Sequence, residues 1–100
     1  MELSKRHLLN ILDFFDKCKY FGIKDYKIDL DCLGDDELYF AVEVRGNYGT
    51  LCYNNVFDCL VEEFLYELEK DFDVNDTYCV PEDGDFDKDC SLIFSLLEKR

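Results

Sequence analysis

Acidic side chains are the residues of this sequence best suited to chemistry, and they are unevenly distributed. Residues 25–98 contain 21 Asp and Glu but only four Lys and Arg, whereas residues 1–24 contain three acids and five cations. Carboxylates at this density can ligate calcium, transfer protons or neutralise the Lys and Arg side chains of a partner. The formal net charge of -13 exceeds the magnitude of about 2–8 that suffices for the solubility of a small domain. The excess charge favours a strongly basic partner.

Three groups of acids are candidates for a partner-binding surface. One group lies on a predicted helix, where Asp58 and Glu62 form a like-charge pair one turn apart, as do Glu63 and Glu67. The other two groups lie in predicted turns, where turn formation and helix capping are simpler explanations; for the helix acids the simpler explanation is a solvated outer face. The residues that we predict to bind a partner are Asp35, Asp36, Glu37, Asp58, Glu62, Glu63, Glu67, Glu69, Asp83, Asp85 and Asp87.

A calcium site and a catalytic site are the alternatives. Residues 71–82 place ligand types at loop positions one, three, five and twelve of an EF-hand, but Asp76 replaces the glycine that the sharp turn needs. The single histidine, His7, is predicted to be exposed on a helix, and the spacing suggests no cysteine beside it as a nucleophile. We therefore predict no catalytic residue, no metal ligand, no cofactor and no enzymatic activity.

Six cysteines are predicted to be reduced thiols of a cytoplasmic protein. None belongs to a CxxC pair, and several lie in apolar stretches. The N-terminal segment is too polar for a signal-peptide core, and no apolar run is long enough to cross a bilayer. The negative charge disfavours direct binding to nucleic acid or to an anionic membrane surface.

Three segments carry the apolar periodicity of helices. Residues 4–21 repeat apolar side chains at three- and four-residue steps, with Ser4 as a candidate N-cap and Gly22 after the last turn. A second helix is predicted to begin after an Asn cap at residue 54 or 55 and to run to about residue 70. The pattern also favours a last helix over residues 89–99.

Alternation of apolar and polar residues predicts the strands. Residues 26–32 and 37–45 alternate over their whole length and are separated by a short turn. Residues 50–53 are predicted to form a short third strand after a turn at 46–49, with Tyr48 exposed at the turn. With 48% hydrophobic and 16% aromatic residues, the chain can build a core. We predict one α+β domain, residues 1–100, with a three-stranded antiparallel sheet, helices packed on one face, and the order α-β-β-β-α-α.

The length, the acidity and this order of elements resemble small acidic inhibitors encoded by phages, and more narrowly the anti-CRISPR proteins that occupy the surface of Cas9 that admits DNA. The resemblance implies a non-catalytic, stoichiometric inhibitor that acts as an acidic DNA mimic. Its partner would be a basic nucleic-acid-binding protein such as a Cas effector, and the chain itself would be a monomer or a homodimer. The alternative is an immunity-type or adaptor module that binds a basic partner without competing with nucleic acid.

Overall fold

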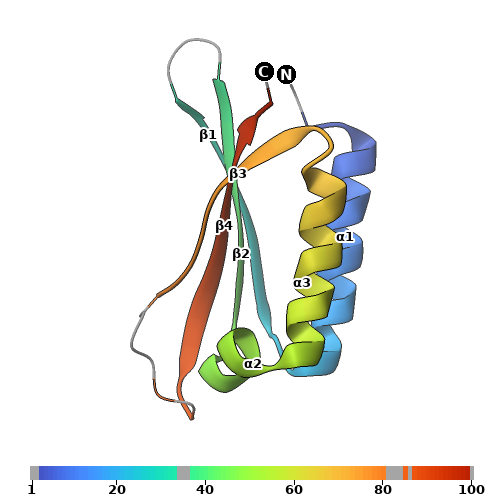
Figure 1. Ribbon diagram of the computed structural model, residues 1–100. Helices are drawn as coiled ribbons and strands as arrows, with labels where there is room; N and C mark the ends of the chain where they lie inside the picture. The colour runs from blue at the N-terminus through green and yellow to red at the C-terminus, as the bar shows by residue number, and fades with distance from the viewer. Residues whose placement is uncertain (1–2, 34–36, 81–84, 86, 100) are drawn as a thin grey trace.

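The computed structural model describes residues 3–33, 37–80, 85 and 87–99, which form a four-stranded antiparallel sheet with helices on one face (Figure 1). The sheet order is β1-β2-β4-β3. Both long helices run along the same face of the sheet, and the short helix α2 lies at one end. In chain order the elements are α1 Lys5–Cys18, the 3₁₀ helix η1 Lys19–Phe21, β1 Asp25–Leu33, β2 Glu37–Asn47, α2 Tyr48–Tyr53, α3 Asn55–Leu68, β3 Phe72–Val80 and β4 Asp89–Glu98.

This arrangement is α+β, but the predicted three-stranded sheet and the order α-β-β-β-α-α are wrong. The observed order is α-β-β-α-α-β-β. Residues 50–53 belong to helix α2, because the Asn47 side chain accepts a hydrogen bond from the Thr50 N–H and caps a helix at this point. Tyr48 is consequently buried, at 7% exposure, and the prediction that it is accessible is also wrong.

The C-terminal segment is the largest correction, because the predicted last helix is strand β4. Its apolar residues fit a helical period and an alternating period equally well, so the pattern alone does not separate the two. In the structure β4 pairs with β2 on one side and with β3 on the other. Cys90, Leu92, Phe94 and Leu96 then face the helices at alternate positions and are all buried.

A seam of phenylalanine rings joins the helices to the sheet. Phe14 of α1 and Phe64 of α3 stack with ring centroids 4.0 Å apart. Phe94 of β4 lies edge-on to both rings, at 6.0 Å and 5.8 Å. Such pairs add about 0.5–1.5 kcal/mol each beyond the burial of apolar area. The seam therefore fixes α1 and α3 side by side over the sheet.

Local capping residues define the helix ends. Ser4 caps α1 and Gly22 has a φ of 75° after η1, which confirms both predictions. The Asn54 side chain accepts hydrogen bonds from the N–H groups of Val56 and Phe57, each at 3.0 Å, so α3 begins where it was predicted to begin. Within the described residues, no helix has the length and apolar character needed to cross a membrane.

Candidate functional site

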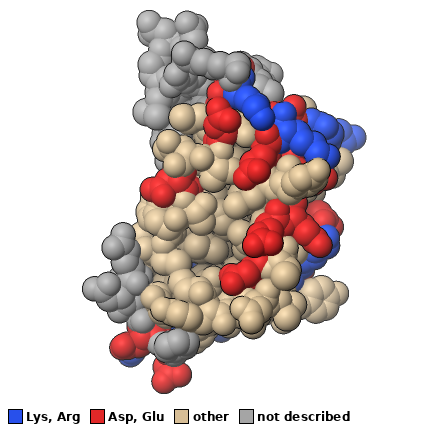
Figure 2. Space-filling model, in the orientation of Figure 1, with Lys and Arg blue, Asp and Glu red and all other residues tan. Residues whose placement is uncertain are grey.

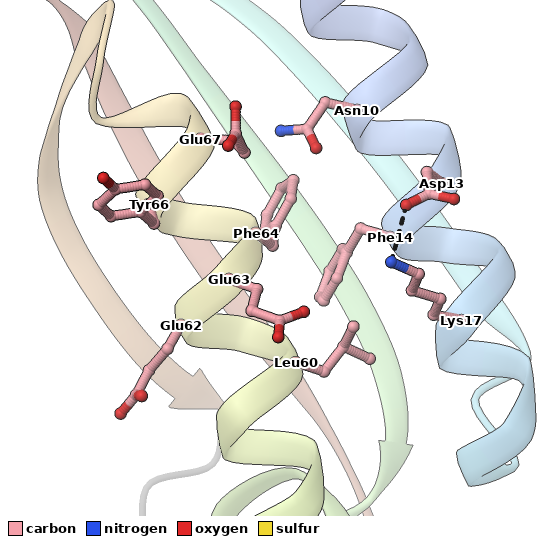
Figure 3. A pocket seen from close by; sticks show the side chains of 10 residues that line it. All are labelled: Asn10, Asp13, Phe14, Lys17, Leu60, Glu62, Glu63, Phe64, Tyr66 and Glu67. Carbon is pink, nitrogen blue, oxygen red and sulfur yellow. Dashed lines mark ion pairs between the residues drawn. The ribbon is translucent and has the colours of Figure 1, made fainter.

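A groove of about 530 Å³ runs between α1 and α3 on the surface of the helical layer (Figure 3). Its apolar floor consists of Phe14 and Phe64, which are buried in the seam, and the half-buried Leu60. Polar and acidic side chains form the rest of the lining. The lining residues are Asn10, Asp13, Phe14, Lys17, Leu60, Glu62, Glu63, Phe64, Tyr66 and Glu67.

The carboxylates of α3 form two rows because an α-helix has 3.6 residues per turn, so residues three or four apart lie on the same side. Glu63 and Glu67, one turn apart, lie on the side of α3 that faces α1, and we call them the groove row. Asp58, Glu62 and Glu69 share the other flank at spacings of four and seven residues, and we call them the outer row. The exposed Tyr66 lies between the rows, and Figure 3 shows Tyr66 and Glu62 pointing away from α1.

Most of these carboxylates keep their charge uncompensated. Glu67 accepts from the Lys70 ammonium at 3.2 Å, and across the groove Asp13 pairs with Lys17 at 3.1 Å. Asp58, Glu62, Glu63 and Glu69 are exposed and form no ion pair with any other described residue. In Figure 2 acidic side chains follow the side of the molecule where α3 lies, while cations gather near the chain ends. The α3 surface therefore presents four exposed carboxylates that no described cation compensates.

Three other predicted partner-binding residues that the structure describes lie outside α3. Glu37 begins β2, whereas Asp85 and Asp87 are exposed just before β4 begins at Asp89. Because Asp89 pairs with Asn47 at the far end of β2, these acids lie at opposite ends of the sheet. Asp35, Asp36 and Asp83 lie outside the described residues. The structure thus brings the α3 acids together, whereas the described members of the two turn groups, Glu37, Asp85 and Asp87, belong to other parts of the chain.

Residues 71–80 do not form a calcium-binding loop. Residues 72–80 are strand β3, with a bulge between Val74 and Asp76, and an extended strand directs successive side chains to opposite faces. Asp71 instead binds Arg6 and His7 of α1. Glu82, at position twelve of the predicted loop, lies outside the described residues.

His7 is buried, at 5% exposure, so the prediction of an exposed histidine is wrong. Its Nδ1 accepts from the Ser4 backbone N–H at 3.2 Å, and its Nε2 donates to Asp71 at 2.9 Å. The ring also packs edge-on against Phe72, with centroids 4.8 Å apart. The hydrogen bond from His7 and the charge of Arg6 hold the pKa of Asp71 below its ordinary value of 3.8.

The chain from Ser4 through His7 to Asp71 has the residue types of a hydrolase triad, but it is built as a helix cap. The Ser4 Oγ accepts from the His7 N–H at the start of α1, which is a capping-box arrangement. Neither the α1–α3 groove nor a second cavity, lined in part by Asp16 and Tyr20, includes Ser4. The arrangement therefore fastens the beginning of α1 to the beginning of β3.

Sequence reasoning missed the contribution of α1 to the groove. Asn10, Asp13 and Lys17 are not among the predicted site residues, although the four-residue spacing of Asp13 and Lys17 is a recognisable ion-pair signal. Only the packing of α1 on α3 brings Asp13 opposite Glu63 and Glu67. Comparison of the chain with protein-family models, with curated proteins and with solved structures gives no match.

Proposed function

We propose that this protein is a non-catalytic, stoichiometric inhibitor that uses the acidic surface of α3 to occupy a cationic, nucleic-acid-binding groove of a partner. The resemblance to anti-CRISPR proteins makes a Cas effector the first partner to test. The carboxylates would replace backbone phosphates as the counter-charges of Lys and Arg side chains.

The observation that supports this proposal most directly is the density of carboxylates along α3, of which Glu67 alone pairs with a described cation. From Asp58 to Glu69 five carboxylates span about 16 Å at about 1.5 Å per residue, or one charge per about 4 Å. A strand of B-DNA carries one phosphate per about 3.4 Å of helix axis. The linear charge density of α3 is therefore close to that of one DNA strand.

The groove adds a site for a basic anchor from the partner. The aliphatic part of a Lys or Arg side chain can lie on Phe14, Leu60 and Phe64, since long basic side chains pack their stems on apolar surface. Its charged end would then reach the acids at the rim, Asp13, Glu63 and Glu67. This combination of apolar floor and acidic rim selects a basic side chain over an acidic or purely apolar one.

The structure around the single histidine agrees with a non-catalytic role. Both ring nitrogens of His7 are engaged, with Ser4 and with Asp71, and the ring is buried. A general base must reach the proton that it abstracts. His7 is held away from the groove, so we assign it to folding.

A competition experiment with a purified, guide-loaded Cas9 tests the proposal. We expect the protein to bind with 1:1 stoichiometry, to displace the target DNA, and to associate more slowly as salt is raised. Replacing Glu62, Glu63 and Glu67 together by Gln should raise Kd by about 100-fold, since three lost contacts of about 1 kcal/mol each correspond to roughly that factor.

The matched control removes three acids from the opposite face of the sheet. Asp25, Asp73 and Asp76 are exposed there, and Asp25→Asn, Asp73→Asn and Asp76→Asn together change the net charge by the same amount. This control should leave Kd within about threefold of the wild type, because distant exposed charges are largely screened. Equal weakening by both triple variants would show that net charge rather than the α3 surface drives binding, and retained DNA binding at saturating inhibitor would refute the DNA-mimic mechanism.

The alternative, an immunity-type or adaptor module, predicts a different result from the same variants. It requires a basic partner that the α3 variant loses but that nucleic acid does not displace. Capture of partners from host lysate by wild type and by the α3 variant, each with and without added DNA, separates the two functions.

A further inference from the structure

Three cysteines that are far apart in the sequence meet at one end of the sheet. Cys52 comes from α2, Cys79 from β3 and Cys90 from β4, and their sulfur atoms all lie within 4.8 Å of one another. The sulfurs of Cys52 and Cys79 are 2.8 Å apart. Cys18 and Cys59 lie outside this group.

The fold dictates this convergence. Cys79 pairs with Leu92 across the β3–β4 ladder, which places Cys79 diagonally beside Cys90 on the face that the helices cover. The Asn47 cap and a hydrogen bond from the Tyr48 N–H to the Lys88 carbonyl, at 2.8 Å, hold α2 against the beginning of β4. Cys52 therefore lies next to the two strand cysteines.

Burial differs among the three thiols in a way that suits a binding site. Cys90 is fully buried, whereas Cys52 and Cys79 are half-buried and accessible from solvent. Burial raises the pKa of Cys79 to about 12 and that of Cys90 to about 11, although the charge of Arg45 opposes the shift at Cys90. Without a bound cation Cys79 and Cys90 are therefore neutral thiols at pH 7.

We propose that Cys52, Cys79 and Cys90 bind a soft, closed-shell metal ion through their three sulfur atoms. This inference does not depend on the proposed inhibitory function. Thiolate sulfur selects Cu(I) and Zn(II) over hard cations such as Mg(II) and Ca(II). A trigonal Cu(I) ion needs only the three sulfurs, whereas Zn(II) would take water as its fourth ligand.

The distances allow such a site after a small adjustment. Metal–sulfur bonds of about 2.3 Å place ligand sulfurs roughly 3.8–4.0 Å apart. Cys52 and Cys79 would separate by about 1 Å, which rotation of the partly exposed Cys52 side chain can provide. In the binding step three S–H bonds break, three metal–sulfur bonds form, and three protons pass to the solvent.

A disulfide between Cys52 and Cys79 is the competing chemistry, and the third thiol argues against it. A disulfide joins two sulfurs and would leave Cys90 buried directly beside it. It would also require an oxidant such as a small-molecule disulfide to accept two electrons. Three converging donors with one solvent-facing side match a metal site more fully.

The test uses the full chain, reduced and freed of metal under anaerobic conditions. It is titrated with Zn(II) and, separately, with Cu(I), each in competition with a chromophoric chelator. We expect one ion per chain, release of three protons in calorimetry across buffers of different ionisation enthalpy, and sulfur-only protein ligation by X-ray absorption. Cys52→Ser and Cys79→Ser should each weaken binding by more than about 100-fold, since even changes in outer-shell partners cost 10–100-fold.

Cys59→Ser is the matched control, because Cys59 is exposed on α3 and lies outside the cluster. It should bind the metal as the wild type does. Cys90→Ala tests the buried ligand, with circular dichroism verifying that the variant folds. Preference for Cu(I) would assign trigonal coordination, and preference for Zn(II) with one bound water would assign the four-coordinate form. Binding that Cys79→Ser leaves unchanged would overturn the proposal. So would a reduced protein that retains neither ion and forms a Cys52–Cys79 disulfide once a small-molecule disulfide is added as the two-electron oxidant.

Discussion

The two long helices have equal lengths of 14 residues but opposite charge arrangements. In α1 each acid has a nearby cation, since Asp13 pairs with Lys17 and Asp16 pairs with Lys19. Lys17 also lies in the last turn, where it complements the helix dipole. The last turn of α3 contains no basic residue, and among the described residues only Glu67 of its carboxylates has an ion pair, with Lys70 just beyond the helix.

This difference separates the charges that stabilise the fold from those that do not. Both helices bury phenylalanines in the same seam, so each is held to the sheet by apolar contacts. The pairs on α1 support the helix locally, whereas the like charges on α3 oppose helix formation. The carboxylates of α3 are thus available to an external partner, which is why we place the proposed function there.

The largest expected effect tests whether the seam, rather than charge, holds the helices in place. Phe64→Ala should lower the free energy of unfolding by about 3–5 kcal/mol, because it removes a buried ring that stacks on Phe14 and contacts Phe94. Leu12→Ala, at a position 52% exposed on α1, should change it by less than about 0.5 kcal/mol. Urea unfolding at low and high salt measures both. If Phe64→Ala lowered the free energy of unfolding by less than added salt does, the model of an apolar seam would be contradicted.

The hydrogen bond between His7 of α1 and Asp71, next to β3, should make the stability of the protein depend on pH. The pKa of Asp71 is lowered in the folded state, so the stabilising contribution of its charge is complete above the unfolded value, near 3.8, and is lost as pH falls through the lower folded value. We expect Asp71→Asn to be less stable than the wild type at pH 7 and to lose less stability on acidification. Asp73→Asn, an exposed neighbour, should leave the pH profile almost unchanged. Thermal unfolding measured from pH 7 to pH 2 compares the three proteins.

The smallest effects test the charge comparison directly and should have opposite signs. Glu63→Gln removes a like-charge contact with Glu67 and should stabilise the protein by about 0.2–0.5 kcal/mol. Asp16→Asn breaks the pair with Lys19, 3.2 Å apart, and should destabilise it by a similar amount. Both shifts in the free energy of unfolding should become smaller at high salt, because exposed charges are screened. If both variants shifted urea unfolding in the same direction, the contrast between α1 and α3 would fail.

Sequence patterns predicted elements well where one period dominated. The first helix with its Ser4 cap, the first two strands, and the start of α3 at Asn54 all follow from local signals. The pattern failed at residues 89–98, where apolar positions fit two periods and the choice depended on pairing with strands β2 and β3. The spacing of the charges on α3 could be predicted from the sequence, but the groove could not, because four of its ten lining residues belong to α1.

The composition of the sequence determines the excess of acid. Local interactions determine the helix caps and the like-charge spacing on α3, since these involve residues within one or two turns of each other. Long-range packing decides the rest. It buries His7 against Asp71, places β4 between β2 and β3, and gathers Cys52, Cys79 and Cys90 at one end of the sheet. The physical reason is that antiparallel pairing and helix docking join residues far apart in the chain, 27 positions for Cys52 and Cys79 and 64 for His7 and Asp71, and no local pattern records which of them will meet.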